Sequence, residues 1–275
     1  MTRRPEMVWP VDPEYHADYI RMVEQGRAVA GDLTVSIVAI ARNAMPHITN
    51  TLALIDELRA GWKASNVYIY ENDSVDGTAQ VLDEHLGVVV EHDSLGGEDA
   101  RGFEPERTIR LAHCRNRCLD RGVSRGSSVT IVLDTDPPGG FSVDGVFNSV
   151  AWLAQKRSEP SAMKAGGMAS YSLFRRPDGV AHYDAWAARP PSWWRDRRNE
   201  IGFLWFSSFL PPVGSPPCPM NSAFGGLGVY WTEAILSGRY EGGDCEHVAL
   251  HRSMAKAGWQ MFLNPGCRYI SVWEE

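Results

Sequence analysis

The chain has 275 residues and a formal net charge of −7, and apolar and charged residues make up 44% and 22% of it. This is ordinary globular usage, so a substantial buried core is expected, and we expect one large domain. The acidic balance argues against tight binding to a nucleic-acid backbone, which depends on Lys and Arg displacing counterions. A nucleic-acid partner is therefore not expected.

Neither a membrane span nor a secretory leader is expected from the pattern of apolar residues. No run approaches the about 18 apolar residues that a transmembrane helix needs. Arg3 and Arg4 are not followed by the apolar stretch of a signal peptide. Five cysteines without paired CxxC spacing fit reduced thiols. These features together predict a cytoplasmic protein.

The first part of the chain predicts strands and helices in strict alternation. Residues 1–32 form an N-terminal extension with one polar, amphipathic helix at 15–29. The strands are β-branched, apolar runs bounded by turns. They are expected at 33–41, 67–70, 88–91 and 129–133, with helices at 50–59, 79–86 and 105–121. This order predicts an α/β fold with a parallel sheet that binds ligands at the carboxyl ends of its strands.

Beyond residue 150 the alternation fades. Residues 183–219 are rich in aromatic residues and Pro, and such a segment is either a wall of a binding site or a packed surface excursion. Trp193, Trp194 and Trp205 are candidates for stacking on a sugar, and plain packing is an equal alternative. A Gly-rich stretch at 221–230 and a helix at 244–257 follow.

Asp134 and Asp136 directly follow the fourth predicted strand. Two carboxylates at one strand end can both reach one hard cation, and Mg²⁺ or Mn²⁺ binds to a few carboxylates together with phosphate oxygens. Asp-rich turns are common, so the motif alone has a structural alternative. Its place after a buried strand and before Pro-Pro-Gly-Gly favours a metal site.

Two further segments carry polar groups toward the same edge of the sheet. The turn at 71–78 follows the second strand, where acceptor groups suit a nucleobase and ribose, while Asp76 is expected to cap the next helix. The helix at 105–121 carries Arg107 and Arg115, about 80° out of phase on the helix. An inward Arg would neutralise a diphosphate, although solvated surface is the alternative for any one of them.

These segments, in this order, resemble the nucleotide-diphospho-sugar transferase fold known as GT-A. Residues 35–43 (VSIVAIARN) resemble its first strand, and residues 70–78 (YENDSVDGT) its nucleotide turn. Residues 107–119 (RTIRLAHCRNRCL) are similar to its Arg-Asn helix, and residues 132–136 (VLDTD) to its metal motif. The spacing around Arg115 and the later Cys-Glu-His segment most resemble the capsule-associated mannosyltransferase-like family.

The resemblance implies a single domain over 33–275, with a mixed, mostly parallel sheet flanked by helices. Residues 33–140 would bind the nucleotide sugar and 141–275 the acceptor. The implied reaction moves a hexose from a UDP- or GDP-linked donor to a glycan, protein or other hydroxyl acceptor. Mn²⁺ or Mg²⁺ is the implied cofactor.

The resemblance also assigns site residues. Asp136 would hold the metal, and Asp134 would contact the ribose, the sugar or the metal. The remaining donor contacts would come from the first strand, the turn and the Arg-Asn helix. They are Ala41, Arg42, Asn43, Glu71, Asn72, Asp73, Arg107, Arg115 and Asn116.

The chain departs from the GT-A pattern in two places. Its turn has Glu71-Asn72 where the pattern has paired Asp. The fold often supplies a late His as a further metal ligand, and residues 265–273 contain none, so His251 is the candidate, with His247 as its alternative.

An acidic residue at the start of the last helix faces the acceptor in this fold, which makes Asp244 or Glu246 a candidate general base. The structural alternatives are an N-cap for Asp244 and a favourable helix-end charge for Glu246.

Three other functions stay open at this point. A nucleotidyltransferase on a related scaffold would need a Gly-rich loop after the first strand, where the chain has residues 41–46 without glycine. A non-catalytic carbohydrate-binding module would explain the tryptophans but not the Asp pair. Transfer onto DNA is disfavoured by the negative charge.

Overall fold

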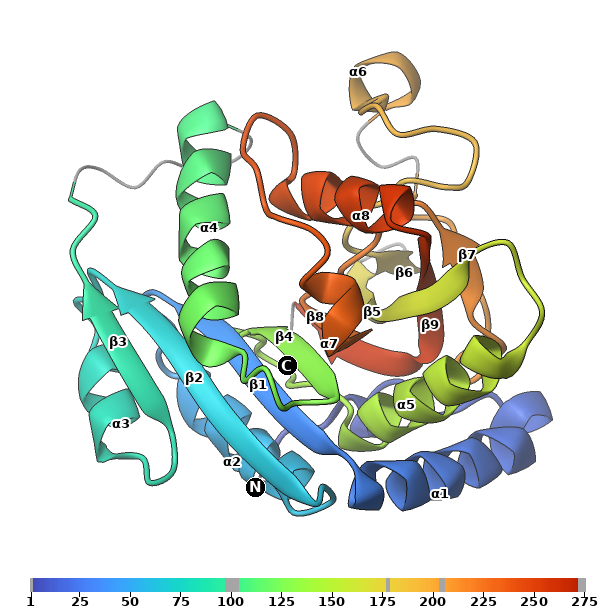
Figure 1. The fold of residues 1–275 in the computed structure, drawn as a ribbon, viewed down its shortest axis with the longest axis horizontal. Coiled ribbons are helices and arrows are strands. Elements are labelled where there is room, and N and C mark those ends of the chain that lie inside the picture. Colours follow the sequence, from blue (N-terminus) through green and yellow to red (C-terminus); the bar gives the residue numbers. More distant parts are fainter. Residues whose placement is uncertain (1, 97–103, 177–178, 203–205, 272–275) are drawn as a thin grey trace.

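The computed structural model describes residues 2–96, 104–176, 179–202 and 206–271. Within these ranges nine strands form one mixed sheet with the order β3-β2-β1-β4-β8-β5-β9-β7, and β6 pairs with β5 (Figure 1). Helices cover both faces of the sheet, which confirms the predicted α/β architecture of a single domain.

The first half of the sheet is parallel. It consists of β1 (Thr34–Ala41), β2 (Ala64–Asn72), β3 (Val89–Asp93) and β4 (Val129–Asp134). Their connections carry α2 (Ile48–Arg59), α3 (Thr78–Glu84) and α4 (Pro105–Arg117), and α4 ends in a π-helical turn, Cys118–Gly122. β1 is central and its Val and Ile side chains are buried, as a β-branched run covered on both faces requires.

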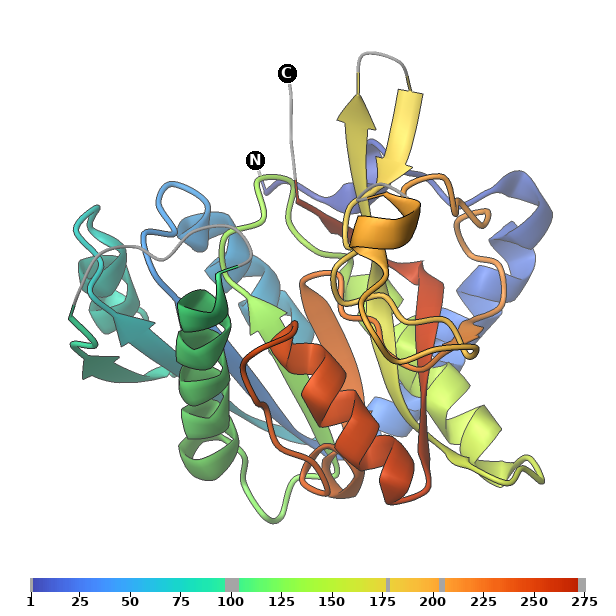
Figure 2. The ribbon, with the colours of Figure 1, turned by 90° about the horizontal axis from the view of Figure 1, so that it is seen from above.

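The second half of the sheet is mixed, because β8 is antiparallel to β4 and β5, β9 is parallel to β5, and β7 is antiparallel to β9. β8 (Leu227–Trp231) runs against β4, followed by β5 (Lys164–Arg176), β9 (Trp259–Ile270) and β7 (Cys218–Met220). β6 (Gly179–His182) forms a hairpin with the end of β5 that projects beyond the sheet (Figure 2). The helices of this half are α5 (Val143–Ser158), α6 (Arg198–Ile201), α7 (Thr232–Ile235) and α8 (Glu246–Lys256).

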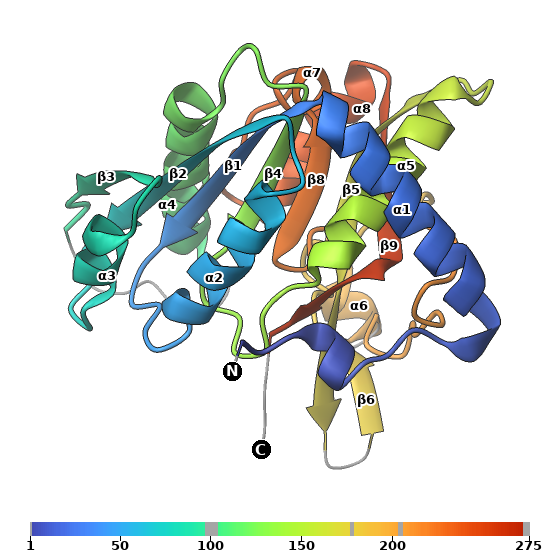
Figure 3. The same cartoon turned by 90° about the horizontal axis from the view of Figure 1, so that it is seen from below.

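Two layers of helices enclose the sheet. α1, α2 and α5 cover one face, whereas α4 and α8 lie on the other, next to the strand ends that carry the acidic residues (Figure 3). α4 and α8 therefore bring residues from the two halves of the chain together above β4.

The N-terminal segment packs on the same body. It contains the short turns Pro5–Met7 and Pro13–Tyr15 and then α1 (His16–Asp32), which lies against α5. The buried guanidinium of Arg268 in β9 donates hydrogen bonds to the Trp9 carbonyl and the Tyr19 hydroxyl. Across the described ranges, no helix has the length and apolar character to cross a bilayer.

Candidate active site

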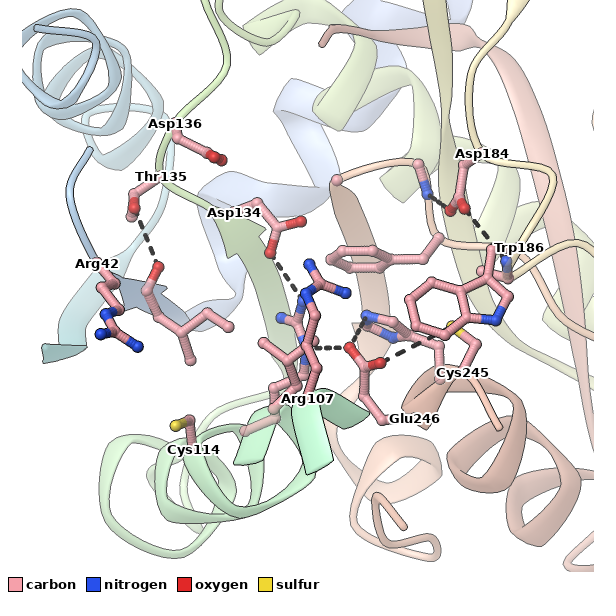
Figure 4. Close-up of a pocket in the computed structure, with 18 of the residues that line it drawn as sticks. Arg42, Arg107, Cys114, Asp134, Thr135, Asp136, Asp184, Trp186, Cys245 and Glu246 are labelled. Carbon is pink, nitrogen blue, oxygen red and sulfur yellow. Dashed lines mark hydrogen bonds and ion pairs between the residues drawn. The ribbon is translucent and has the colours of Figure 1, made fainter. Parts of the chain in front are cut away.

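A pocket of about 420 Å³ opens at the carboxyl ends of β1 and β4 (Figure 4). One wall comes from β1, β4 and α4, and the opposite wall comes from the segment after β6, the turn before β8 and the start of α8. The reversal of strand direction between β4 and β8 creates this edge, and ligands of open α/β sheets bind at such places.

Asp134 and Asp136 lie in the middle of the pocket. Asp134 is the last residue of β4, and its backbone N–H donates to the Gly226 carbonyl at 2.8 Å. Asp136 follows in the turn after β4 and is its exposed residue, between the buried Thr135 and Pro137. Loss of hydration and, second, the charge of Asp134 raise the pKa of Asp136.

This pair fits a divalent cation. Mg²⁺ and Mn²⁺ sites commonly use one or two carboxylates and take other ligands from substrate phosphates. Among the described residues no three His, Cys, Asp or Glu side chains form a ready cluster. A cation bound here would relieve the repulsion that raises the pKa of Asp136, so the donor set suits a metal that arrives with a phosphate ligand.

Arg115 joins the two walls of the pocket. Its side chain is only 5% exposed, and it donates to Asp134 through Nη2 and to Glu246 through Nε, each at 2.8 Å. It also lies over the Phe224 ring, 4.9 Å from the ring centre. The guanidinium is thus shared between two carboxylates, which fixes Asp134 and Glu246 relative to each other.

Three other arginines line the pocket: Arg42, Arg107 and Arg110. Arg107 is half-buried and lies over the Trp186 ring at 5.7 Å from its centre. Arg110, one turn further along α4, was not among the predicted site residues, because its exposure could not be read from the helix phase alone. Arg42, Arg107 and Arg110 form the cationic side of the pocket. Arg115 shares its charge with Asp134 and Glu246.

Only part of the predicted nucleotide turn reaches the pocket. Ala41 and Asn72 line it. The Asn43 side chain accepts from Val75 N–H, and the buried Glu71 carboxylate accepts from Ser74 N–H and contacts His92. Asp73 accepts from Ser94 and Leu95. These three side chains lie outside the pocket lining and hold the turn in shape.

Asp76 has the structural role that the sequence predicts. Its carboxylate accepts from the backbone N–H groups of Thr78 and Met45. It thereby ties the start of α3 to the segment that follows β1.

The assignments of Asn116 and His251 require correction. The Asn116 amide bonds the Tyr240 backbone at both its carbonyl and its N–H, so it supports the loop before α8 and does not face a ligand. His251 is fully buried, and its ring nitrogens are bonded to the Ser222 and Tyr230 hydroxyls. Neither nitrogen is available to a metal, because α8 turns this face into the core.

His247, the alternative to His251, does line the pocket but is also buried. Its ring stacks on Phe224 with 3.6 Å between the ring centres. Burial, followed by the charge of Arg115, lowers the pKa of His247 well below its usual value. The ring is therefore a neutral packing element next to Glu246.

The two predicted acidic residues at α8 occupy different places. Asp244 pairs with the buried Arg189 at 2.8 Å and lies outside the pocket lining. Glu246 lines the pocket, but its carboxylate is 3% exposed and ion-paired with Arg115. The N-cap of α8 is Cys245, so the structural alternative for Asp244 is wrong, whereas Glu246 does lie in the first turn of the helix.

Four other residues that line the pocket were not among the site residues predicted from the sequence. Asp184, Trp186, Phe224 and Tyr269 line the wall opposite α4. Asp184 accepts from Gly225 N–H at 2.7 Å and from Ala187 N–H at 3.2 Å. A single Asp in an irregular segment carries no spacing signal, so only the three-dimensional path of the chain reveals it.

Two aromatic side chains from the described part of the segment at 183–219 line the pocket, Tyr183 and Trp186. Trp186 lines it, whereas Trp193 and Trp194 do not and instead lie under Arg197 and Arg252, with Arg–ring distances of 4.9 and 5.6 Å. Trp205 lies outside the described residues. Of the three tryptophans expected to stack on a sugar, the two that the structure describes thus lie outside the pocket lining.

Two glycines allow this crowded geometry. Gly225 and Gly226 have φ angles of +68° and +89°. A Cβ on Gly226 would lie 2.4 Å from the Tyr269 ring, and one on Gly225 would lie 2.5 Å from the Ser170 carbonyl oxygen. Only glycine fits both the left-handed backbone and the space.

No family model matches the sequence, and the comparison with curated proteins gives no match. Solved structures do match. The mannosyltransferase PcManGT from Pyrobaculum calidifontis, in complex with GDP-Man and Mn²⁺, is 15% identical with a TM-score of 0.52, over 95% of this chain and 68% of that one. This neighbour shares the GT-A fold of nucleotide-sugar transferases with the two that follow. The chain has the GT-A fold.

Two further GT-A structures agree. GalNAc-T7 with UDP, GalNAc and Mn²⁺ is 13% identical with a TM-score of 0.55, over 97% of this chain and 54% of that one. TarS 1–349 from S. aureus is 11% identical with a TM-score of 0.50, over 87% of this chain and 60% of that one. The chain spans little more than half the length of these two proteins.

Proposed function

We propose that the protein is a metal-dependent glycosyltransferase that moves a hexose from a UDP- or GDP-linked donor to a hydroxyl acceptor on a glycan or protein. The observation that carries the proposal is the pocket at the end of β4. It combines the carboxylates Asp134 and Asp136 with Arg42, Arg107 and Arg110 on a GT-A fold. Such a site offers a cation and positive side chains to one diphosphate.

Asp136 and Asp134 would hold Mn²⁺ or Mg²⁺ together with the diphosphate oxygens. When bound, the metal would act as a Lewis acid that stabilises charge on the departing nucleoside diphosphate. Asp136 is the exposed member of the pair and the more direct ligand. Asp134 is oriented by Arg115 and is suited to the ribose, the sugar or the metal's other ligands.

The donor-binding half would comprise residues 33–140, and the acceptor-binding half residues 141–275. Arg107 and Arg110 project from α4 into the pocket and would neutralise the diphosphate by charge-assisted hydrogen bonds. Ala41 and Asn72 line the side suited to the nucleoside. Structural neighbours are complexed with GDP-Man or UDP and with Mn²⁺, which supports a nucleotide-sugar donor and a divalent metal.

Two finer assignments belong to this proposal. The Arg–Asn helix and the Cys-Glu-His segment support a capsule-associated mannosyltransferase-like specificity. The second assignment is a cytoplasmic location. It is supported by the five cysteines, which are free, because thiols of this kind persist in the reducing cytoplasm.

The test is calorimetric titration of UDP- and GDP-sugars with Mn²⁺, with Mg²⁺ and with a chelator. We expect at least one donor to bind only with metal and to be hydrolysed slowly. If no nucleotide sugar binds in any condition, the proposal is wrong.

The assay also separates the alternatives. Release of pyrophosphate from a nucleoside triphosphate and a sugar phosphate would indicate a nucleotidyltransferase. Binding of free sugars without nucleotide or metal would indicate a carbohydrate-binding module. Radiolabel transferred to DNA, included among the acceptors, would indicate DNA modification.

A further inference from the structure

The pocket contains three acidic side chains besides Asp136, and their partners differ. The charges of Asp134 and Glu246 are both shared with Arg115. Asp184 is held only by backbone N–H groups, those of Gly225 and Ala187, in the contacts that the structure gives for it. An ionised carboxylate can accept about four hydrogen bonds, so Asp184 keeps acceptor capacity on both oxygens.

The position of Asp184 suits an acceptor hydroxyl. Asp184 and Trp186 lie on one wall, and Arg42 and Thr135 lie on the other, with Asp134 and Arg107 between them (Figure 4). With the diphosphate on the arginine side, the sugar carbon that reacts would lie toward Asp184. Trp186 presents an aromatic ring beside it, and such rings bind the apolar faces of sugars.

We propose that Asp184 is the general base that takes the proton from the acceptor hydroxyl, and that neither Asp244 nor Glu246 is. This inference rests on the proposed glycosyltransferase function. The acceptor oxygen forms a bond to C1 of the sugar while the bond from C1 to the β-phosphate oxygen breaks. That electron pair leaves with the nucleoside diphosphate, and the acceptor proton passes to Asp184 and then to solvent. This direct displacement inverts the configuration at C1.

The electrostatic surroundings agree with this role. Burial raises the pKa of Asp184 above its usual value. The backbone hydrogen bonds from Gly225 and Ala187 lower this pKa, and the charges of Glu246 and Asp134 raise it. The other titratable groups affected by its charge are Tyr183 and Cys245. A carboxylate that is not neutralised by an arginine is the better proton acceptor, because a base gains strength as its pKa approaches the working pH.

Asp244 and Glu246 have different roles in this scheme. Asp244 accepts from Arg189, which also donates to the carbonyls of Trp186 and Trp194, so the pair fixes the wall that carries Asp184. Glu246 holds Arg115 in place. Both are positioning residues.

The experiment uses methanol as the simplest acceptor hydroxyl, with Mn²⁺ and the UDP- or GDP-sugar that the calorimetric panel selects. The variants are Asp184→Ala, Asp184→Asn and, as a matched pocket carboxylate, Glu246→Gln. The measurements are donor Kd, turnover to methyl glycoside, its anomeric configuration, and the effect of added formate as an external carboxylate.

We expect Asp184→Ala to lower turnover by at least about 100-fold with donor Kd unchanged, as loss of a general base does. Formate should restore part of the turnover of Asp184→Ala and none of that of Glu246→Gln. The methyl glycoside should have the inverted configuration.

Unchanged turnover in both Asp184 variants overturns the inference and leaves the glycosyltransferase proposal intact. The same holds if turnover and donor affinity fall together, if formate restores only Glu246→Gln, or if the product retains its configuration. If the wild-type protein binds no nucleotide sugar, the proposed function itself fails and the inference with it.

Discussion

The two halves of the sheet contribute to the pocket in different ways. In the parallel half, the site residues stand at strand ends: Ala41 ends β1, Asn72 ends β2 and Asp134 ends β4. In the second half, Asp184 and Trp186 lie on an irregular segment fixed by the buried side chain of Arg189. The first wall is positioned by backbone pairing, the second by side-chain hydrogen bonds.

This difference predicts which substitutions affect chemistry and which affect folding. Asp136 should separate the two most cleanly, because it is exposed and its removal relieves repulsion with Asp134. We expect Asp136→Ala to lower Mn²⁺-dependent donor binding by at least about 100-fold, since even outer partners of metal ligands are worth about 10- to 100-fold. The melting temperature without ligand should stay nearly constant. Calorimetry and thermal denaturation measure the two effects.

Arg115 tests the contact that joins the walls. Arg115→Met would leave Asp134 and Glu246 without their buried partner, and breaking such a pair costs about 3–5 kcal/mol of unfolding free energy. Urea denaturation measures this loss. Arg107→Met on the same helix is the control, and an equal loss of stability in both variants would contradict the assigned roles.

Substitution of Arg107 tests the donor-binding wall, and here we expect a loss of donor affinity instead of a loss of stability. A charged hydrogen bond to phosphate is worth about 1.5–3 kcal/mol, so Arg107→Met should weaken donor binding roughly 10- to 100-fold. Arg117, the last residue of α4, is paired with Glu91 outside the pocket and is the matched control. A larger loss of affinity in Arg117→Met than in Arg107→Met would sink the assignment.

The prediction with the smallest effect near neutral pH concerns two histidines in the core of the second half. Burial lowers the pKa of His251 and of His182 to about 3, whereas an unfolded His titrates near about 6.5. Below pH 6.5 or so the unfolded chain binds protons that the folded protein does not. Stability should therefore fall from that pH toward about 3, by up to about 1.4 kcal/mol per pH unit for each residue.

His251→Gln should remove one of these two contributions and make the pH dependence of unfolding shallower. Urea denaturation between these pH limits measures it. The Mn²⁺ dependence of donor binding should not change, because the ring nitrogens of His251 bond to hydroxyls in the core. A variant that loses metal dependence would restore His251 as a ligand.

The same contrast explains what could be predicted from sequence. The parallel strands and their helices lie where apolar runs and turn residues predicted them: β1 begins at Thr34 instead of residue 33, and α2 begins at Ile48 instead of residue 50. Strand ends then located Asp134 and Asp136. The alternation of elements carries this information locally in the sequence.

The second wall could not be located in the same way. Asp184 reaches the pocket because Arg189 and the turn at Gly225 hold its segment against β8, and these contacts join residues far apart in sequence. The place of His251 could not be predicted either, since the face of α8 that packs on β8 depends on the strand order. Long-range packing decides both outcomes.

The turn at Gly225 and Gly226 affects how the results of a mutational scan of this protein should be interpreted. We expect the replacement of either glycine by any other residue to abolish activity as completely as Asp136→Ala does. An added methyl group would displace Tyr269 or the Ser170 backbone beside the pocket. Sensitivity to substitution alone would then place two residues without any functional group among those that perform the reaction.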